Sequence, residues 1–457
     1  MDLRGKQVSV AGLGKSGYSI VKILLDLGAD VFISDSKSEK ELLESLAGLD
    51  MANVSYEADG NTSKIYEGKD LIILSPGISI NHPVIAKAKQ ADVLVISEIE
   101  MAYRLAKAPI IAVTGTNGKS TTVSLIYNLL KNTGINSLLA GNIGNPLSGE
   151  VLAHKDVSWI IAEISSFQLE TILDFHPKIS VITNITPDHT DRHGSMEGYI
   201  KAKARIFENH NSSDFAVLNS DCSSVLKASE NIKSNRIFFS ILTEVANGFY
   251  LKNGDIFSCF SGIKEKYCNI DEIPIKGEHN IKNILALLCV AYILEIPVSD
   301  VLKSLGSFQP LHHRMEFVGK IGKVSFYDDS KGTNPGAVIA AVNSISEPLA
   351  LIAGGKDKNM DFSEMSELIA KKAKTLIVIG ETGQKISEQV KSFGLDNIIN
   401  CGYDFETAVR TAFEQVKDKG GVVLLSPACA SFDMFKSAEH RGDEFRRIVS
   451  EMERVKV

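Results

Sequence analysis

One segment, residues 109–132, constrains the fold more than any other part of the chain, and it reads PIIAVTGTNGKSTTVSLIYNLLKN. Its apolar start, residues 110–113, is typical of a buried parallel strand. From residue 119 onward apolar side chains recur at helical spacing, and Thr133 with Gly134 ends that helix. A glycine-rich turn lies between them. The segment therefore predicts a strand, an anion-binding loop and a helix, in that order.

The chemistry of phosphate binding is concentrated in this loop and in the first turn of the helix. Four backbone N–H groups can turn toward an anion at the positive end of the helix: those of Gly115, Thr116, Asn117 and Gly118. Lys119 adds a full charge, and the Ser120 hydroxyl can ligate a Mg²⁺ that bridges phosphates. The general P-loop spacing would require a glycine at position 113, where this chain has Val113, so this loop is a shortened form of the motif. The alternative is a plain glycine turn.

Length and charge limit the classes of protein to consider. A chain of 457 residues holds about three domains, and we place them at residues 1–97, 98–310 and 311–457. Hydrophobic residues make up 44% and charged residues 23%, which is typical of a soluble enzyme. The net charge of −7 argues against nucleic-acid binding.

Cysteine usage and the apolar segments predict a cytoplasmic enzyme with no membrane partner. The six cysteines lack C-x-x-C spacing, which favours free thiols in a reducing compartment: Cys222, Cys259, Cys268, Cys289, Cys401 and Cys429. The first six residues have no apolar core of a signal peptide. The most apolar helical candidate, residues 284–296, is too short to span a bilayer.

The first domain opens with a second glycine motif. A short strand at residues 7–11 runs into Gly-Leu-Gly-Lys-Ser-Gly at residues 12–17, and a helical pattern follows. The next strand, residues 31–34, is closed by Asp35, about twenty residues after the glycines, where a dinucleotide fold places its ribose-binding acid. Another strand, residues 71–74, ends in Ser-Pro-Gly. These features are compatible with NAD, with a UDP-type nucleotide, or with a Rossmann-like fold that binds neither.

In the central domain polar residues follow predicted strands of a parallel sheet. Glu163 comes directly after the apolar residues 159–162, and His189 lies shortly after residues 180–183. Strand carboxyl ends are where open α/β sheets bind ligands. With Ser120, these two side chains would place a metal over the central loop. The alternative for each is an ordinary surface or core side chain.

Composition alone predicts that Lys203 is a solvent-exposed lysine on a helix.

The third domain repeats this pattern with four strands, at residues 324–327, 349–353, 375–379 and 421–425. Each strand ends in a polar or glycine-containing turn. These turns read Asp-Asp-Ser-Lys-Gly-Thr-Asn-Pro at 328–335, Gly-Gly-Lys-Asp-Lys at 354–358, Gly at 380 and Ser-Pro-Ala-Cys-Ala-Ser at 426–431. The pattern predicts a second Rossmann-like sheet, with a helix starting at Ser431.

Taken together, these motifs resemble the Mur ligase family over the whole chain. The shared motifs are GTNGKST, EISSFQ at 163–168, residues 184–191 with His189, GEHN at 277–280 and His-Arg at 313–314. The segments DSKGTN at 329–334 and SPACASFD at 426–433 are similar to those of family members that add D-glutamate. The resemblance implies an α/β protein with a Rossmann-like nucleotide-binding N-terminal domain, a central P-loop ATPase-type parallel-sheet domain and a Rossmann-like C-terminal domain.

The implied activity is that of an ATP-dependent amide ligase of peptidoglycan precursor synthesis. Such an enzyme phosphorylates the carboxylate of UDP-N-acetylmuramoyl-L-alanine, and the amine of D-glutamate attacks the acyl phosphate. ATP and Mg²⁺ at two sites, or Mn²⁺, are the implied cofactors. We expect a monomer whose partners are these three substrates, with no nucleic acid and no membrane.

The resemblance also assigns roles to individual residues. The implied catalytic residues are Lys119, Glu163, His189, Lys203 and Lys331. ATP binding is implied for Gly115, Thr116, Asn117, Gly118, Lys119, Ser120, Thr121, Asn142, Asn280, Arg314 and Asp329. UDP-substrate binding is implied for Gly14, Lys15, Ser16, Asp35, Ser36, Ser75, Pro76, Gly77, Asn142 and His189. D-Glutamate binding is implied for Thr333, Lys358, Ser431 and Phe432. The implied metal ligands are Ser120, Glu163, His189 and Lys203, the last as a carbamate.

Two functions from other classes remain open at this point. An NAD-dependent dehydrogenase would use Gly12, Gly14, Gly17 and Asp35, but it leaves GTNGKST without a role. A nucleotide-gated binding or regulatory protein would hold or hydrolyse ATP without needing an amino acid. ATP turnover with and without the two other substrates separates both from a ligase.

Overall fold

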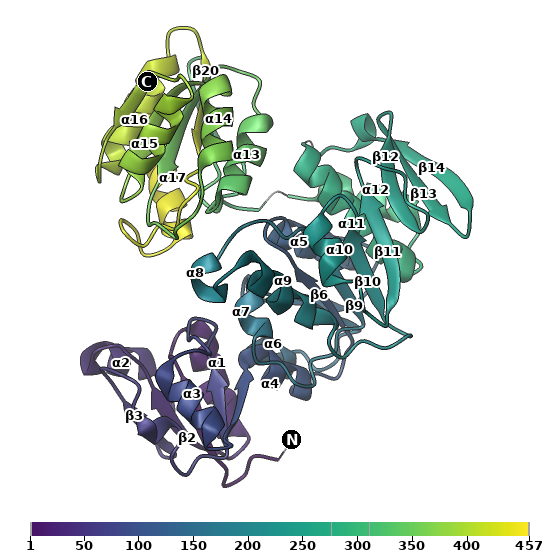
Figure 1. Ribbon diagram of the computed structural model, residues 1–457, viewed down its shortest axis with the longest axis vertical. Helices are drawn as coiled ribbons and strands as arrows, with labels where there is room; N and C mark the ends of the chain where they lie inside the picture. The colour runs from purple at the N-terminus through teal and green to yellow at the C-terminus, as the bar shows by residue number, and fades with distance from the viewer. Residues whose placement is uncertain (1, 276, 310, 456–457) are drawn as a thin grey trace. The chain divides into compact units, whose positions relative to one another are not determined.

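The computed structural model describes residues 2–275, 277–309 and 311–455, and it contains three sheets that follow one another along the chain (Figure 1). The chain forms two compact units. Unit 1 comprises Met1–Ile185, Glu197–Lys276 and Asn280–Phe308, and unit 2 comprises Thr186–Met196, Gly277–His279 and Gln309–Val457. The segment that carries His189 thus belongs to unit 2, although it follows a strand of the central sheet.

The first sheet has five parallel strands in the order β3-β2-β1-β4-β5. Strands β1, β2 and β4 lie where the sequence predicts them, because runs such as Leu-Ile-Ile-Leu in β4 are buried throughout, whereas β3 and β5 were not predicted. The elements are β1 (Gln7–Ala11), α1 (Lys15–Asp26), β2 (Asp30–Ser34), α2 (Glu39–Leu46), β3 (Val54–Glu57), β4 (Leu71–Leu74), α3 (Pro83–Gln90) and β5 (Leu94–Ser97).

The central sheet has nine strands in the order β14-β13-β12-β11-β10-β9-β6-β8-β7. The strands from β7 to β12 are parallel, as predicted, and β13 and β14 extend the sheet as an antiparallel meander that the sequence analysis did not anticipate. The strands are β6 (Ile110–Thr114), β7 (Ser137–Gly141), β8 (Trp159–Glu163), β9 (Ile179–Ile182), β10 (Phe215–Asn219), β11 (Asn235–Ser240), β12 (Gly248–Lys252), β13 (Asp255–Phe260) and β14 (Ile263–Asn269).

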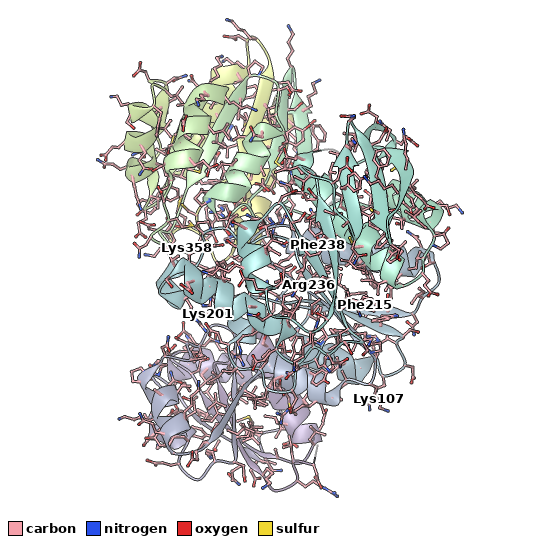
Figure 2. All side chains as sticks on the ribbon, turned by 45° about the vertical axis from the view of Figure 1, so that its right-hand side comes forward. Lys107, Lys201, Phe215, Arg236, Phe238 and Lys358 are labelled. Atoms are coloured by element: carbon pink, nitrogen blue, oxygen red, sulfur yellow. The ribbon has the colours of Figure 1, made fainter. Side chains whose placement is uncertain are left out.

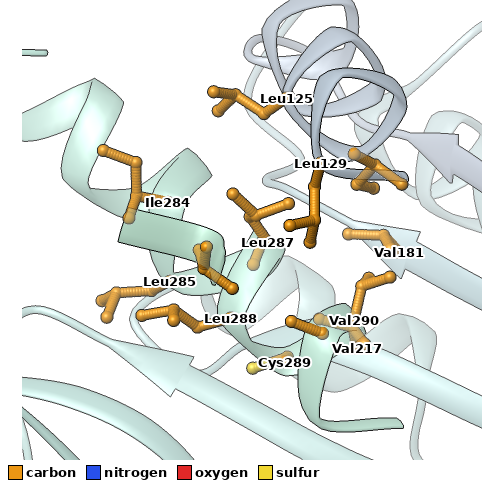
Figure 3. Packing of buried hydrophobic residues seen from close by; sticks show 14 of the residues in the cluster. Leu125, Leu129, Val181, Val217, Ile284, Leu285, Leu287, Leu288, Cys289 and Val290 are labelled. Carbon is orange, nitrogen blue, oxygen red and sulfur yellow. The ribbon is translucent and has the colours of Figure 1, made fainter. Parts of the chain in front are cut away.

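Two long helices, α5 (Lys119–Asn132) and α11 (Glu278–Ile293), pack together over the central sheet and form its core. The helices of this part are α4 (Glu98–Leu105), α5 (Lys119–Asn132), α6 (Leu147–Ala153), α7 (Ser166–Leu169), α8 (Thr190–His193), α9 (Met196–Ala204), α10 (Ser223–Ala228), α11 (Glu278–Ile293) and α12 (Val298–Ser307). Figure 3 shows Leu125 and Leu129 of α5 meeting Leu287 of α11 above Val181 and Val217 of the sheet. Burial of these side chains fixes the start of α5, and with it the loop in front of that helix.

The third sheet has six strands in the order β15-β16-β20-β17-β18-β19, and β15 alone is antiparallel to its neighbour. Its elements are β15 (Glu316–Ile321), β16 (Val324–Asp328), α13 (Pro335–Asn343), β17 (Leu349–Gly354), α14 (Ser363–Lys372), β18 (Ala373–Ile379), α15 (Gly383–Ser392), β19 (Ile398–Asn400), α16 (Phe405–Val416), β20 (Gly421–Leu425) and α17 (Ala438–Val455). In the described part of the chain, no helix has the length and apolar character needed to cross a bilayer.

Candidate functional site

The loop between β6 and α5, residues 115–118, is called the central glycine loop below, and both its glycines are required by their surroundings. Gly115 has φ +150°, and a Cβ there would lie 2.0 Å from Thr183 Oγ1. Gly118 has φ +84°, and its Cβ would lie 2.5 Å from Asn283 Oδ1. Larger residues would therefore clash as well as strain the backbone. Gly118 is also the N-cap of α5, and among the described residues no side chain caps this helix.

Asn184, which follows β9, hydrogen-bonds the central glycine loop along its length. Its carbonyl oxygen accepts from the Thr116 N–H at 2.8 Å, and its Oδ1 accepts from the Asn117 N–H at 2.9 Å. Its Nδ2 donates to the Asn117 carbonyl at 2.9 Å, where Thr183 Oγ1 also donates at 2.6 Å. The loop is thus held in shape by its neighbouring strand, which prepares it for a ligand without further ordering.

Two lysines converge on one carbonyl of this loop. Lys119 Nζ donates to the Gly115 oxygen at 2.9 Å and to the Thr116 oxygen at 2.8 Å. Lys203 Nζ donates to the same Gly115 oxygen at 2.8 Å and to Thr114 Oγ1 at 3.3 Å. Lys203 is 1% exposed, whereas Lys201 on the same helix is solvent-facing (Figure 2). The composition-based view of Lys203 as a solvated lysine is therefore wrong.

A buried carboxylate ends the strand beside the central glycine loop. Glu163 pairs in register with Val113 of β6 and is 2% exposed. Asn142 Nδ2 donates to Glu163 Oε1 at 2.7 Å, whereas Oε2 has no hydrogen-bond partner among the described residues. An unpaired buried carboxylate oxygen is costly unless a cation or donor completes it. The site therefore fits a divalent cation, with the buried Ser120 hydroxyl on the neighbouring helix turn.

The start of α11 lies against the same loop. Asn283 is buried there, and its Oδ1 accepts from Thr122 Oγ1 at 3.3 Å. Asn280 lies three residues earlier, on the same face of the helix, and is half-buried. Asn283 was not among the residues predicted from the sequence. Its spacing of three residues from Asn280 could have indicated it, because residues three apart share a face of a helix. Thr121, predicted to bind ATP, lies in the first turn of α5.

The first glycine loop, residues 12–17, is held by its own sheet. Asp35 Oδ2 accepts from the Leu13 N–H at 2.5 Å, and its Oδ1 accepts from the Lys37 N–H at 2.8 Å. Ser75 Oγ donates to the Gly12 carbonyl at 2.6 Å. A Cβ at Gly17 would lie 2.0 Å from that carbonyl. The sequence-predicted residues Asp35 and Ser75 are thus gathered around this loop, and both bind protein groups.

The remaining predicted residues of this region lie in the first glycine loop itself or follow β2 and β4, the two strands that pair with β1. Gly14 is the N-cap of α1, Lys15 begins the helix, and Ser16 follows. Ser36 and Gly77 are exposed. A small cavity in unit 1 is lined by Ser75 and Pro76 and also by residues of the α7 region, namely Phe167, Gln168, Glu170 and Thr171. The turn after β4 and the α7 region therefore line one cavity.

In unit 2, Asp329 follows β16 and is fully enclosed. Burial raises its pKa to about 7, while the Ser426 hydroxyl, which donates to Oδ2 at 2.7 Å, and the Arg314 charge oppose that rise. The Met315 N–H donates to Oδ1 at 3.3 Å. Lys331, two residues further, lies 3.5 Å from Glu439 Oε1. Thr333 is half-buried in the same loop.

A buried arginine that the sequence analysis missed holds two loops of the third sheet together. Arg441 of α17 is 1% exposed, and its guanidinium donates to the Ser330 carbonyl at 2.9 Å and to Ser330 Oγ at 3.0 Å. It also donates to the Cys429 carbonyl at 3.2 Å and to the Ala430 carbonyl at 3.4 Å. Burial lowers its pKa to about 10. The loops that carry Lys331, Thr333 and Ser431 are thereby fixed to each other.

The predicted helix at Ser431 is absent, and this expectation is wrong. Ser431 is buried and starts a turn, in which its carbonyl accepts from the N–H groups of Met434 at 3.0 Å and Phe435 at 2.7 Å. Asp433 Oδ2 accepts from the Glu381 N–H at 3.0 Å, which ties this turn to the end of β18. The helix therefore begins only at Ala438. Phe432 is 73% exposed.

His189 and Lys358 lie together in unit 2. His189 is the N-cap of α8 with φ +51°, an uncommon conformation for a residue with a side chain. The carboxylate of Asp188 accepts from the His189 N–H at 2.9 Å and lies 3.4 Å from Lys358 Nζ. The predicted residues thus fall into three groups, one around the first glycine loop and one around the central glycine loop, both in unit 1, and one in unit 2.

The fold and the central loop define a nucleotide-binding α/β protein of the P-loop type. Three family models match successive parts of the chain: Mur ligase MurD-like, N-terminal domain at residues 6–97; Mur ligase middle domain at 113–291; and Mur ligase, glutamate ligase domain at 313–429. The chain belongs to the Mur ligase family.

Curated relatives match over their full length. A protein of Thermoanaerobacter sp. (strain X514) named UDP-N-acetylmuramoylalanine--D-glutamate ligase is 44% identical over 457 residues, covering 99% of this chain and 100% of the relative. A protein of the same name from Clostridioides difficile (strain 630) is 40% identical over 453 residues, covering 99% and 100%.

Solved structures share the fold. The MurF ligase from Thermotoga maritima in complex with ADP matches with a TM-score of 0.60 and 16% identity, covering 100% of this chain and 97% of that chain. A pseudomurein peptide ligase type C from Methanothermus fervidus matches with a TM-score of 0.60 and 18% identity, covering 98% and 100%.

Proposed function

We propose that this protein is an ATP-dependent amide ligase that adds D-glutamate to UDP-N-acetylmuramoyl-L-alanine in peptidoglycan precursor synthesis, forming ADP and phosphate. The observation that carries the proposal is the full-length identity of 44% to a relative named for this reaction. The reaction passes through an acyl phosphate, as is general for the family. ATP first phosphorylates the substrate carboxylate, and the D-glutamate amine then attacks the carbonyl carbon and displaces phosphate.

The three parts of the chain divide this work. Residues 1–97 bind the UDP-substrate around the first glycine loop, with Gly14, Lys15 and Ser16 at the start of α1 near its phosphates. Residues 98–310 bind ATP, and residues 311–457 bind the amino acid. The family matches, which fall in three successive stretches, support this division.

Charge neutralisation at the central glycine loop is the main contribution to the first step. Phosphoryl transfer to a carboxylate brings two anions together, and preorganised cations lower that barrier. Lys119 lies at this loop, and Asn142 lies beside Glu163. Asn280 is assigned to the adenine, Arg314 to the phosphates and Asp329 to the ribose. Lys331 is placed near the transferred phosphoryl group.

The donor set around Glu163 suits Mg²⁺, which prefers oxygen ligands. Its Oε2, which has no hydrogen-bond partner among the described residues, supports one cation site together with Ser120, and His189 is assigned to a second. We further propose that Lys203 reacts as a free amine with CO₂ to form a carbamate and release a proton. This reaction would turn a buried amine into an anionic oxygen ligand. The burial of Lys203 beside the loop supports the assignment, since burial favours the neutral amine.

The amino-acid site needs donors for two carboxylates and space for a free amine. Lys358, Thr333 and Ser431 supply them, and the Arg441 contacts fix two of their loops together. Phe432 is assigned to the rim of this site. We also propose that the enzyme acts as a monomer in the cytoplasm, where ATP is available. Sedimentation of the purified protein tests the oligomeric state.

One assay tests the function directly. Phosphate release is measured with ATP and Mg²⁺ alone, with UDP-N-acetylmuramoyl-L-alanine added, and with D-glutamate added as the third substrate. The ligase proposal expects rapid release only with all three, together with a new amide product detected by mass spectrometry. If ATP hydrolysis proceeds at the same rate with and without D-glutamate, the protein is a regulatory ATPase. A nicotinamide-dependent absorbance change would indicate a dehydrogenase. Efficient use of a diamino acid would reject the assigned amino acid.

A further inference from the structure

Asp188 brings two hydrogen-bond donors of the third sheet together around one carboxylate. It is 6% exposed, and its Oδ2 accepts from Asn334 Nδ2 at 3.3 Å while its Oδ1 lies 3.4 Å from Lys358 Nζ. The three residues come from separate segments of unit 2, namely the 186–196 segment, the loop after β16 and the loop after β17. None of these contacts is local in the sequence.

The Asn334 donor is held in position by its other role. Asn334 is the N-cap of α13, and its Oδ1 accepts from the Ala337 N–H at 2.9 Å. Because the capping bond fixes the amide plane, the NH₂ group is directed away from the helix and toward Asp188. Asn334 is 5% exposed. The position therefore offers a preformed N–H donor for a carboxylate.

The Lys358 ammonium also needs an anion, because its side chain is only 15% exposed. Asp188 provides one, but its 3.4 Å contact with Lys358 is longer than the roughly 2.7–2.9 Å usual for an ammonium and a carboxylate, and its 3.3 Å contact with the neutral Asn334 amide is longer than the roughly 2.9–3.0 Å usual for N–H donors. A free carboxylate that can approach both donors more closely has an advantage over this tethered one. Substrate is such a carboxylate, if the proposed function holds.

We propose that Asp188 is a stand-in for a carboxylate of D-glutamate. In the amino-acid-free enzyme the Asp188 carboxylate pairs with Lys358 Nζ and accepts a hydrogen bond from Asn334 Nδ2. The carboxylate of the incoming D-glutamate then replaces Asp188 at both donors. Asn334 is then an additional specificity-determining residue for the amino acid. This inference rests on the proposed function, since it assumes that Lys358 binds D-glutamate.

The sign of the effect on KM tests the inference. Asp188→Asn removes the competing charge, so the KM for D-glutamate should fall by roughly threefold to tenfold while those for ATP and the UDP-substrate stay constant. Asn334→Ser keeps a capping oxygen but deletes the amide donor, so the KM for D-glutamate alone should rise. The matched control is Glu381→Gln, which removes a carboxylate from an exposed ion pair with Lys356 in the same unit and should change none of the three constants.

The alternatives give different results. If Asp188→Asn raises the KM for D-glutamate, Asp188 binds the substrate itself and the stand-in inference is overturned. It is also overturned if this variant lowers only the unfolding temperature or kcat and leaves all three KM values unchanged, because the residue is then structural. If the unaltered protein forms no amide from D-glutamate, the proposed function has failed, and that result is seen before any variant is made.

Discussion

The first and central glycine loops are similar in sequence but differ in the charges around them. Each follows a buried strand and opens a helix whose N-cap is glycine, Gly14 in α1 and Gly118 in α5. The first loop is held by a carboxylate, since Asp35 accepts the Leu13 N–H. The central loop is held by amide and hydroxyl groups, and the Nζ atoms of Lys119 and Lys203 both donate to its Gly115 carbonyl.

Under the proposed function, this difference separates a loop that only binds substrate from a loop at which a phosphoryl group is transferred. A loop stabilised by an aspartate can hold a phosphate group through its helix N-terminus, but the local negative charge does not favour transfer to an anion. A loop that carries the Lys119 charge can neutralise negative charge that develops during transfer, and so can a divalent cation held by Glu163 Oε2, which has no hydrogen-bond partner among the described residues. Under the proposed function, the same order of strand, glycine turn and helix therefore serves two roles, and the charged residues around each loop decide which role it has.

The largest effect is expected from Lys119→Ala. Loss of one preorganised charge at the central loop should reduce turnover by roughly 10²- to 10³-fold, with little change in unfolding temperature. Steady-state ligation and thermal unfolding are measured on the same preparation. The matched comparison is Lys15→Ala, the lysine at the equivalent place in the first loop, which should raise the KM for the UDP-substrate but keep kcat at saturating substrate. Near-normal ligation by Lys119→Ala would remove the distinction between the loops.

Lys203→Ala should lower activity by roughly 100-fold, because it removes a group next to the Gly115 carbonyl and a proposed metal ligand. Small carboxylic acids that enter the vacated space should restore part of the activity. Lys201→Ala on the same helix is the control, and it should be unaffected because Lys201 faces solvent. Full activity of Lys203→Arg would contradict the carbamate, since a guanidinium cannot ligate Mg²⁺.

Asp35→Asn should act on the first loop alone. The amide can accept only one of the two N–H bonds now made by Asp35, which costs about 1–3 kcal/mol of unfolding free energy for the unpaired group. We expect a higher KM for the UDP-substrate and an unchanged KM for ATP. Asp30→Asn at the opposite end of β2, where the carboxylate accepts from Gln7 Nε2, is the control. Equal changes in both constants would show that the loops are not independent.

The last prediction concerns the pH dependence of stability and not turnover, at Asp329, the aspartate that follows β16. Its folded pKa of about 7 lies above its ordinary value of 3.8. As pH rises through this interval the unfolded chain loses the proton first, so stability falls between about pH 4 and 7 and is level above. Each unit of difference is worth about 1.4 kcal/mol. Asp329→Asn should lack this part of the slope in denaturant unfolding, and an identical slope would contradict the raised pKa.

The central loop was predictable from the sequence because its function is local. Strand, glycine turn, lysine and helix are contiguous, and their order already determines where N–H groups and charge lie. Most strand ends that carry site residues were predictable for a related reason. Buried parallel strands read as apolar runs, and β4 and β20 have the predicted bounds.

Other features needed the tertiary structure, because they depend on contacts between distant residues. Nothing near Asp188 in the sequence indicates its pairing with Asn334 and Lys358. Arg441 reads as one more charge on a helix, yet it is buried against two loops whose nearest residues lie more than ten positions away. The sequence by itself determined the phosphate-binding loop and the α/β class. The tertiary structure decided which lysines are buried and which carboxylates they meet, since burial and pairing arise only when segments far apart in the chain pack together.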